Sequence, residues 1–208
     1  MTDQSAGGLT LDDVLDLRAY ERVREDYRSR VIARKRDRRV SLGPIMTLIF
    51  ECVDTVRFQV QEMARAEKIM SDEATQVELD IYNRLLPGER ELSATLLIEL
   101  TSDHDLREWL PRLLGIERRI GISMDGDVVA SVPEAQHAAA LTRDTITPAV
   151  HYLRFGFTEA QVGEFRDAAE ITLVATHPDY EAQTVLRPSV RAELLGDLLG
   201  TTKPLPIA

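Results

Sequence analysis

Two glutamates in one predicted helix are the first residues that could carry chemistry. The hydrophobic spacing after Gly43-Pro44 predicts a single helix over residues 44–69, and Glu51 and Glu62 both lie on its polar side. Paired carboxylates can bind a metal ion or transfer protons. Eleven residues of helix separate them by about 16 Å along the axis, so they cannot share one metal ion. We expect both to pair with arginines of the preceding helix, or one of them to reach a ligand or metal supplied by the sheet.

The same helix also carries polar residues that favour a ligand site between it and the sheet. Glutamine and glutamate side chains are costly to bury unless they are paired, so a buried cluster of them would point to a bound ligand. His177 would converge on this pocket. The candidate ligand-binding residues are Arg38, Arg39, Glu51, Gln59, Gln61, Glu62 and Asn83.

Two histidines provide a candidate for metal binding. His151 lies in a predicted strand over 148–157 and His177 in one over 170–177, and each shares its face with apolar residues. If the two strands are antiparallel neighbours, the imidazoles meet at one edge of the sheet. With a carboxylate such as Glu62 they could then hold a divalent metal ion. The alternative is that each histidine is separately hydrogen-bonded at the sheet margin.

Other catalytic signatures have little or no support. A carboxylate-bridged di-iron site needs two Glu-x-x-His segments on long helices. Only Glu134 and His137 have this spacing, and Glu134 is expected to cap a short helix over 134–142. The chain has no His-Glu-x-x-His, no phosphate-binding loop ending in Lys-Ser/Thr, no Gly-x-Ser-x-Gly and no Gly-x-Gly-x-x-Gly.

Charge is unevenly distributed along the 208 residues, whose net charge is −10. The stretch from Arg18 to Arg39 holds ten basic and four acidic residues, a local balance of +6, so the rest of the chain carries −16. A nucleic-acid-binding domain is usually basic as a whole, so nucleic acid is not the expected partner. We expect this stretch to pair with acidic surface of the same chain or of a second subunit; an anionic small ligand is the alternative.

Composition indicates a globular protein with one substantial core. Hydrophobic residues make up 44% of the chain and charged residues 29%, which is typical of globular proteins. The longest apolar run is far shorter than the about 20 residues of a membrane span, and the N-terminus lacks the pattern of a secretory signal. A cytosolic location without a membrane contact is therefore expected. Cys52, the single cysteine, is expected to be a small buried residue.

The elements that must position these residues form helices at both ends and strands in the middle. We predict one α+β domain over 1–208, with N-terminal helices packed on a mostly antiparallel sheet of about six strands and a C-terminal helix. Residues 1–90 would be mainly helical, 91–200 would contain the sheet and 201–208 would form a tail. The predicted helices are 11 to the mid-thirties, 44–69, 71–86, 106–114, 134–142, one after Thr158 and 188–200; the predicted strands are 93–100, 120–124, 128–132, 148–157, 170–177 and 182–187.

Three segments together resemble a bacterial family of about 200 residues known only as a domain of unknown function. They are RRVSLGPIMTLIFECVDTVRFQVQEMARAEKI, ELDIYNRLLPGERELSATLLIEL and THPDY. The resemblance covers nearly the whole chain. It implies a cytosolic protein without an established activity, whose relatives are encoded near rubrerythrin-like and iron–sulfur redox proteins. The motif-like parts are Arg38-Arg39-Val40, Phe50-Glu51, the QVQEM run, Glu67, Tyr82-Asn83 and His177-Pro178 with Tyr180.

Two functions of different classes follow from the sequence. The first is a non-catalytic accessory or interaction protein that forms a homodimer and can have a further protein partner. The second is a metal-binding or redox-linked enzyme or sensor, with a divalent metal ion as the possible cofactor and a site between helix 44–69 and the sheet.

Overall fold

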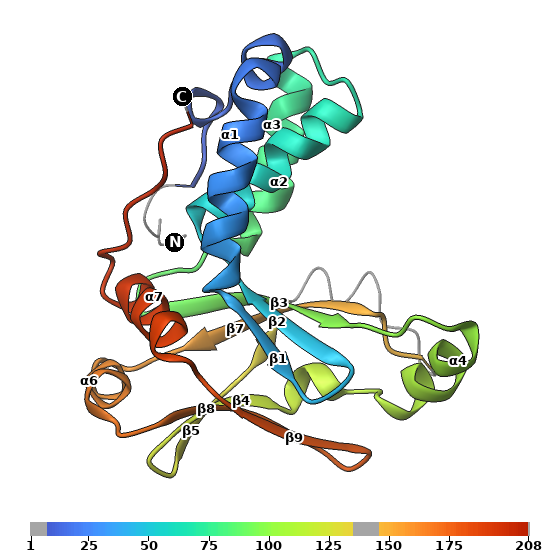
Figure 1. The fold of residues 1–208 in the computed structure, drawn as a ribbon, viewed down its shortest axis with the longest axis vertical. Coiled ribbons are helices and arrows are strands. Elements are labelled where there is room, and N and C mark those ends of the chain that lie inside the picture. The colour runs from blue at the N-terminus through green and yellow to red at the C-terminus, as the bar shows by residue number, and fades with distance from the viewer. Residues whose placement is uncertain (1–7, 135–145, 208) are drawn as a thin grey trace, which may run out of the picture.

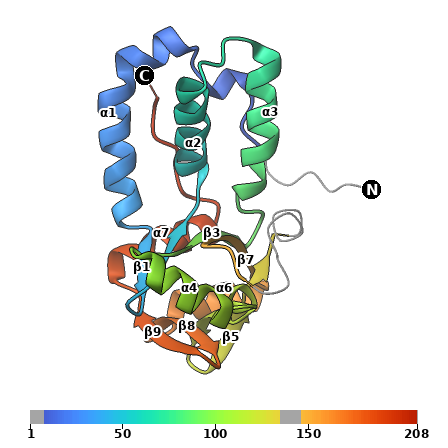
Figure 2. The same ribbon diagram turned by 90° about the vertical axis from the view of Figure 1, so that its right-hand side faces the viewer.

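The computed structural model describes residues 8–134 and 146–207. A bundle of three helices stands on a body made of two sheets and further helices, as Figures 1 and 2 show from two sides. The helices of the bundle are α1 (Leu17–Arg36), α2 (Val53–Ala66) and α3 (Asp72–Tyr82). The remaining helices are α4 (Asp103–Arg112), α6 (Glu159–Asp167) and α7 (Pro188–Leu198), with short 3-10 turns at Leu11–Asp13, Asn83–Leu85 and Ile116–Arg118.

The strands form two antiparallel sheets. The five-stranded sheet has the order β1-β2-β3-β7-β6 and the four-stranded sheet the order β5-β4-β8-β9. Every strand pairing in the described residues is antiparallel. The strands are β1 (Arg39–Leu42), β2 (Met46–Phe50), β3 (Glu91–Ile98), β4 (Ile120–Met124), β5 (Asp127–Ala130), β6 (Val132–Pro133), β7 (Val150–Gly156), β8 (Ile171–His177) and β9 (Tyr180–Val185).

The main core lies between the two sheets. Alternate residues of β2, such as Leu48 and Phe50, join residues of the facing sheet, such as Leu173, in one buried cluster. This alternation is the period-two pattern of a sheet with one apolar face. A separate cluster around Tyr20 and Tyr27 holds the helical bundle together. The α+β class, the N-terminal helices and the C-terminal helix are thus confirmed.

The predicted helix over 44–69 is wrong in its first half. Gly43 has φ of 68° and turns the chain between β1 and β2, and α2 begins only at Val53. The apolar residues of 45–50 pair on both sides, with β1 and with β3. A central strand reads as a short apolar run, which periodicity alone does not distinguish from part of a buried helix. The second half is correct, because Val56 and Val60 are fully buried on α2.

The two histidine strands are not neighbours, so the condition on which the two-histidine metal site depended is not met. His151 lies in β7 of the five-stranded sheet, whose partners are β3 and β6, whereas His177 lies in β8 of the four-stranded sheet, between β4 and β9. The predicted hairpin at Asp125-Gly126 is confirmed, with both residues at positive φ. The predicted helix over 134–142 falls almost wholly outside the described residues. No helix in residues 8–134 and 146–207 combines the length and hydrophobicity of a membrane span.

The turn at Gly43 gives a test of the β1–β2 hairpin. A Cβ atom at Gly43 would overlap the hydroxyl of Tyr180, which donates a hydrogen bond of 2.6 Å to the carbonyl of Leu42. Gly200 has almost the same φ, 65° against 68°, but a Cβ atom there meets nothing within 4 Å. We expect Gly200→Ala to lower the free energy of unfolding by about 1–2 kcal/mol from backbone strain. Gly43→Ala should lower it by about 1–3 kcal/mol more because of the overlap. If urea titrations show that the two variants lose the same free energy of unfolding, the close contact between Gly43 and Tyr180 at the β1–β2 turn is contradicted.

Candidate functional site

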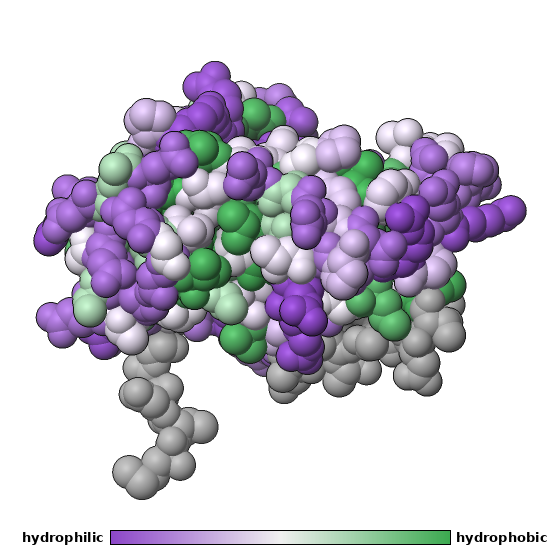
Figure 3. Space-filling model, turned by 90° about the horizontal axis from the view of Figure 1, so that it is seen from below, coloured by the Kyte–Doolittle hydropathy of each residue, from purple (hydrophilic) through white to green (hydrophobic). Residues whose placement is uncertain are grey.

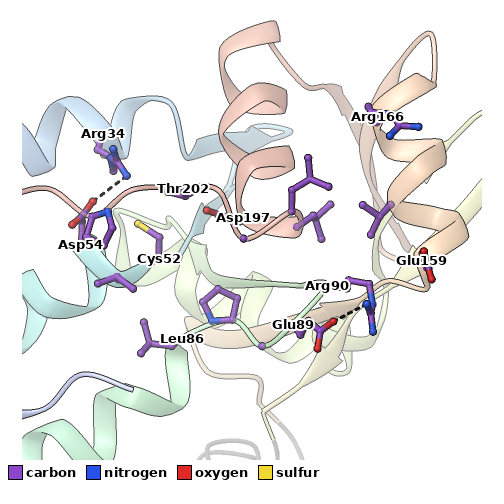
Figure 4. Close-up of a pocket in the computed structure, with 18 of the residues that line it drawn as sticks. Arg34, Cys52, Asp54, Leu86, Glu89, Arg90, Glu159, Arg166, Asp197 and Thr202 are labelled. Carbon is purple, nitrogen blue, oxygen red and sulfur yellow. Dashed lines mark ion pairs between the residues drawn. The ribbon is translucent and has the colours of Figure 1, made fainter. Parts of the chain in front are cut away.

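A cavity of about 790 Å³ lies where the helical bundle, the start of β3 and the last turn of α7 meet. Figure 4 shows Cys52, Asp54 and Leu86 on one side of it and Glu159 and Arg166 of α6 on the other. The volume is within the range of about 300–1,000 Å³ typical of small-molecule sites. The lining residues are Arg34, Cys52, Val53, Asp54, Leu86, Pro87, Gly88, Glu89, Arg90, Glu159, Val162, Gly163, Arg166, Asp197, Leu198, Leu199, Gly200, Thr202 and Pro204.

The junction between β2 and α2 forms one wall of the cavity. Cys52 is the N-cap residue of α2, and its backbone N–H donates a hydrogen bond of 2.9 Å to the hydroxyl of Thr55. The Cys52 side chain in turn accepts from the backbone of Thr55, so the two residues form a capping box with sulfur in the place of the usual oxygen. This cap begins α2 immediately after the strand and places Cys52 and Asp54 at the cavity.

Burial raises the pKa of the Cys52 thiol. The nearby Arg38 guanidinium and the Thr55 backbone hydrogen bond oppose this shift, but burial is the larger effect. The thiol is therefore protonated at neutral pH, and a thiol in this form is a weak nucleophile.

Arg38 forms a buried ion network with α7. Its side chain is fully buried, and its guanidinium donates two hydrogen bonds to Asp197, of 2.7 and 2.9 Å, and two to Glu193, of 3.2 and 3.0 Å. Burial alone would lower the pKa of Arg38, but the hydrogen bonds to Asp197 and the charge of Glu193 outweigh it and raise the pKa. Arg38 therefore stays charged and fixes α7 against the start of β1.

Asp54 forms a second buried network, which holds the C-terminal segment. Asp54 is 1% exposed and lies 3.0 Å from Arg34 and 3.1 Å from Arg57. It also accepts a hydrogen bond of 2.8 Å from the backbone N–H of Leu205, whose carbonyl accepts from Arg57. Leu205 and Ile207 pack on the Tyr20 and Tyr27 cluster. Residues 201–207 thus run along the bundle, between α1 and α2 in Figure 2, and complete one side of the cavity.

Glu51 lies apart from the cavity, in a buried polar cluster between α2 and the five-stranded sheet. It is 3% exposed and accepts hydrogen bonds from the hydroxyls of Thr95, at 2.6 Å, and Thr55, and from the amide of Gln59 at 3.3 Å. Burial, followed by the charge of Glu51, raises the pKa of the nearby Tyr152. The expected pairing of Glu51 with arginines is wrong, because the residue directly follows strand β2 instead of lying on the outer side of a helix.

Glu62 makes the expected contact with the first helix. Its carboxylate accepts hydrogen bonds of 2.8 Å from both the Nε and the Nη2 of Arg24, and another of 2.8 Å from the hydroxyl of Tyr20. These bonds, those from Arg24 above all, lower the pKa of Glu62 although burial opposes the shift. The prediction that Glu62 contacts arginines of the first helix is correct because Glu62 lies in the part of the predicted helix, residues 53–66, that is helical in the structure.

The other predicted ligand residues hold separate parts of the fold. Arg39 pairs with Glu99 at 2.5 Å. The amide of Gln61 bonds both backbone groups of Leu15, at 2.8 and 3.1 Å, and that of Asn83 bonds both groups of Leu9, at 2.8 Å each. Of the seven candidate ligand-binding residues, the structure therefore brings only Glu51 and Gln59 into contact with each other. None of the seven lines the cavity.

The predicted metal residues also lie apart. His151 contacts the hydroxyl of Thr147 at 3.0 Å, and His177 contacts the carbonyl of Leu114 at 3.1 Å and accepts from the N–H of Asp179. Glu62 is already engaged by Arg24 and Tyr20. Within residues 8–134 and 146–207, no group of three or more histidine, cysteine, aspartate or glutamate side chains could hold a metal ion.

The sequence analysis did not identify the residues of the cavity. They come from α1, the β2–α2 junction, the segment before β3, α6, the end of α7 and the C-terminal segment, which no local pattern connects. One available signal was Asp54 followed by Arg57 at the i, i+3 spacing of an ion pair within one helix.

The lowered pKa of Glu62 predicts a pH dependence of stability. Because this pKa is below its ordinary value of 4.5, Glu62 stabilises the folded state above that pH, and the stabilisation is lost as the pH falls through the folded-state pKa. We expect Glu62→Gln to cost about 1–2 kcal/mol at neutral pH and progressively less below pH 4.5. Glu164→Gln, which removes an exposed carboxylate of α6, is the control and should change little. Urea titrations that give the same loss for Glu62→Gln at all pH values would disprove this role.

Comparison with known proteins places the whole arrangement in one family. A crystal structure of a novel protein of unknown function from Burkholderia pseudomallei K96243 superposes with a TM-score of 0.84 at 38% sequence identity, covering 92% of this chain and 100% of that one. A search of curated proteins finds no match. The model of the family described as protein of unknown function (DUF3501) matches residues 8–198, which include most of the cavity wall. This chain therefore belongs to the DUF3501 family.

Proposed function

We propose that the protein binds a small organic ligand in the 790 Å³ cavity and acts in the cytosol as a binding or accessory protein without catalytic chemistry of its own. The observation that carries this proposal is the cavity itself, which has the volume of a small-molecule site and walls from six separate parts of the chain, the C-terminal segment included. The buried networks of Arg38 and Asp54 hold two of these walls in place.

The chemistry of the walls favours a ligand with an apolar body and a polar end. Apolar side chains such as Leu86, Val162 and Leu198 contribute to the lining. Charged residues accompany them, among them Arg90, which pairs with Glu89 at 2.7 Å with both side chains exposed. Exposed pairs of this kind contribute about 0–1 kcal/mol, so a polar group of a ligand could replace one partner at little cost.

Two features of the cavity support binding over catalysis. The buried carboxylates Asp54 and Asp197 are already neutralised by arginines, so neither is positioned as a general base. The pKa of the Cys52 thiol is raised by burial, which disfavours its use as a nucleophile.

Filling the cavity tests the proposal. Gly163 of α6 lines it, and a Cβ atom at Gly163 meets nothing within 4 Å, so Gly163→Phe should project a ring into the open space. We expect this variant to keep or slightly raise the melting temperature, because glycine inside a helix costs about 0.5–1 kcal/mol. Its affinity for the probe 8-anilinonaphthalene-1-sulfonate, followed by fluorescence, should fall at least about tenfold, which corresponds to about 1.4 kcal/mol.

The matched control is Gly156→Phe. Gly156 is exposed at the end of β7, also has open space at its Cβ position, and is not among the lining residues. This variant should bind the probe as the unmodified protein does. The proposal fails if Gly163→Phe binds the probe as tightly as Gly156→Phe, or if the unmodified folded protein binds none.

A homodimer is a second proposal, which the outer face of the four-stranded sheet supports. Strand register places Ala130, Gly121, Val174 and Gln183 in one row across the sheet, and Val128, Ser123 and Thr172 in the next. All seven residues are uncharged, in a chain of net charge −10. Figure 3 views this side of the molecule, with pale and green residues near the centre, some purple ones among them, and more purple ones toward both margins. Two copies can pack this face together across a two-fold axis without opposing like charges.

Light scattering with size-exclusion chromatography tests the homodimer. We expect a mass of twice 23.4 kDa, and a shift toward 23.4 kDa for Val174→Lys, which places a charge at the centre of the face. Val77→Lys is the control, because Val77 is 55% exposed on α3, away from the sheet. A monomeric unmodified protein at every concentration measured, or dissociation by Val77→Lys alone, would refute an interface on this face.

A further inference from the structure

A second hollow, of about 360 Å³, lies between the edges of the two sheets. β1 is an edge strand of one sheet and β9 an edge strand of the other. The hydroxyl of Thr184 on β9 donates a hydrogen bond of 2.7 Å to the carbonyl of Ser41 on β1, which holds the two edges together. The lining residues are Arg36, Arg39, Val40, Ser41, Thr184, Val185, Arg187 and Val190, and they share no member with the 790 Å³ cavity.

Three arginines from three segments surround this hollow, and none of the described residues that line it is acidic. Within the described parts of the chain, the Arg36 guanidinium has no hydrogen bond or ion pair. Among the described residues, the Arg187 guanidinium donates only to the backbone carbonyl of Arg36, at 2.7 Å. Arg39 pairs with Glu99, but both side chains are nearly half exposed, so this pair is weak. Positive charge is therefore available to an anion in the hollow.

The first turn of α7 adds to this positive character. Arg187 is its N-cap residue, Pro188 follows, and the turn has neither a side-chain cap nor an acidic residue. Val190 brings the same turn to the hollow. The N-terminal end of a helix carries partial positive charge and favours anions. Asp37 accepts a hydrogen bond of 2.9 Å from Ser189 at this end, but it does not line the hollow.

We propose that this hollow binds the phosphate or diphosphate group of a small molecule. Guanidinium groups bind phosphate oxygens in a bidentate manner, and three of them at one hollow suit a group with several charged oxygens. Val185 is 50% exposed at the same place and offers an apolar surface to the part of the ligand next to the phosphate. The site is distinct from the cavity proposed above, so either can fail without the other.

Calorimetric titration with inorganic pyrophosphate, inorganic phosphate and hexyl phosphate at low salt tests the site. Pyrophosphate should bind more tightly than phosphate because it contacts more guanidiniums, and hexyl phosphate more tightly than phosphate because of Val185. Arg36→Gln should weaken pyrophosphate binding about tenfold, the effect of losing one charge-assisted contact. Arg28→Gln is the control, because Arg28 is an exposed arginine of the same helix, outside the hollow, and its loss changes the net charge equally.

Three results would overturn the site. The first is no pyrophosphate binding by the folded protein. The second is equal weakening by Arg28→Gln and Arg36→Gln, which would indicate general attraction of anions to α1. The third is binding of a duplex DNA oligonucleotide in the absence of binding of the small phosphates, which would assign the basic surface to nucleic acid. If hexyl phosphate binds the unmodified protein no more tightly than phosphate, the proposed apolar contact of the ligand with Val185 is disproved. The hollow would then be a site for the phosphate group alone.

Discussion

The fold depends on one fully buried cation, the guanidinium of Arg38. It comes from the short link between α1 and β1, and Asp197 and Glu193 of α7 neutralise it. A buried charge without its partners costs several kcal/mol, so these three residues must meet whenever the chain folds. Their contact fixes the C-terminal helix against the N-terminal hairpin, although more than 150 positions separate them in sequence. It also sets the place of both hollows, because the last turn of α7 lines the large cavity and the first turn lines the arginine-rich one.

In the helical bundle, the buried carboxylate of Asp54 likewise holds distant segments together. Its contacts with Arg34, Arg57 and Leu205 connect α1, α2 and the C-terminal segment at the wall of the cavity. Such ionic groups add little net stability but allow few alternative arrangements, because every other arrangement leaves a buried charge unpaired. Charge pairing therefore fixes the relative positions of two walls of the cavity, and its apolar side chains are free to contact a ligand.

Local patterns predicted the elements well and the tertiary contacts less well. Helix caps, the hairpin at Asp125-Gly126 and the Glu62 contact each depend on residues of one element or of neighbouring helices, and they are confirmed. The helix over 44–69 was wrong because an apolar run fits a central strand and a buried helix equally, and this error placed Glu51 on the wrong element. The strand pairing of His151 and His177 depends on sheet topology, which spacing does not encode. Arg38 was singled out, but its acidic partners on α7 were not.

Hydrogen exchange of the Arg38→Met variant tests most directly whether this cation holds α7 in place. Met removes the charge and keeps an apolar side chain, so Asp197 and Glu193 lose their partner while the core between the sheets is unchanged. The account predicts that amides of residues 190–198 in α7 exchange markedly faster than in the unmodified protein, whereas those of the central strands β4 and β8 keep their protection. Unchanged exchange throughout α7, or a uniform loss of protection over the whole chain, would contradict the account.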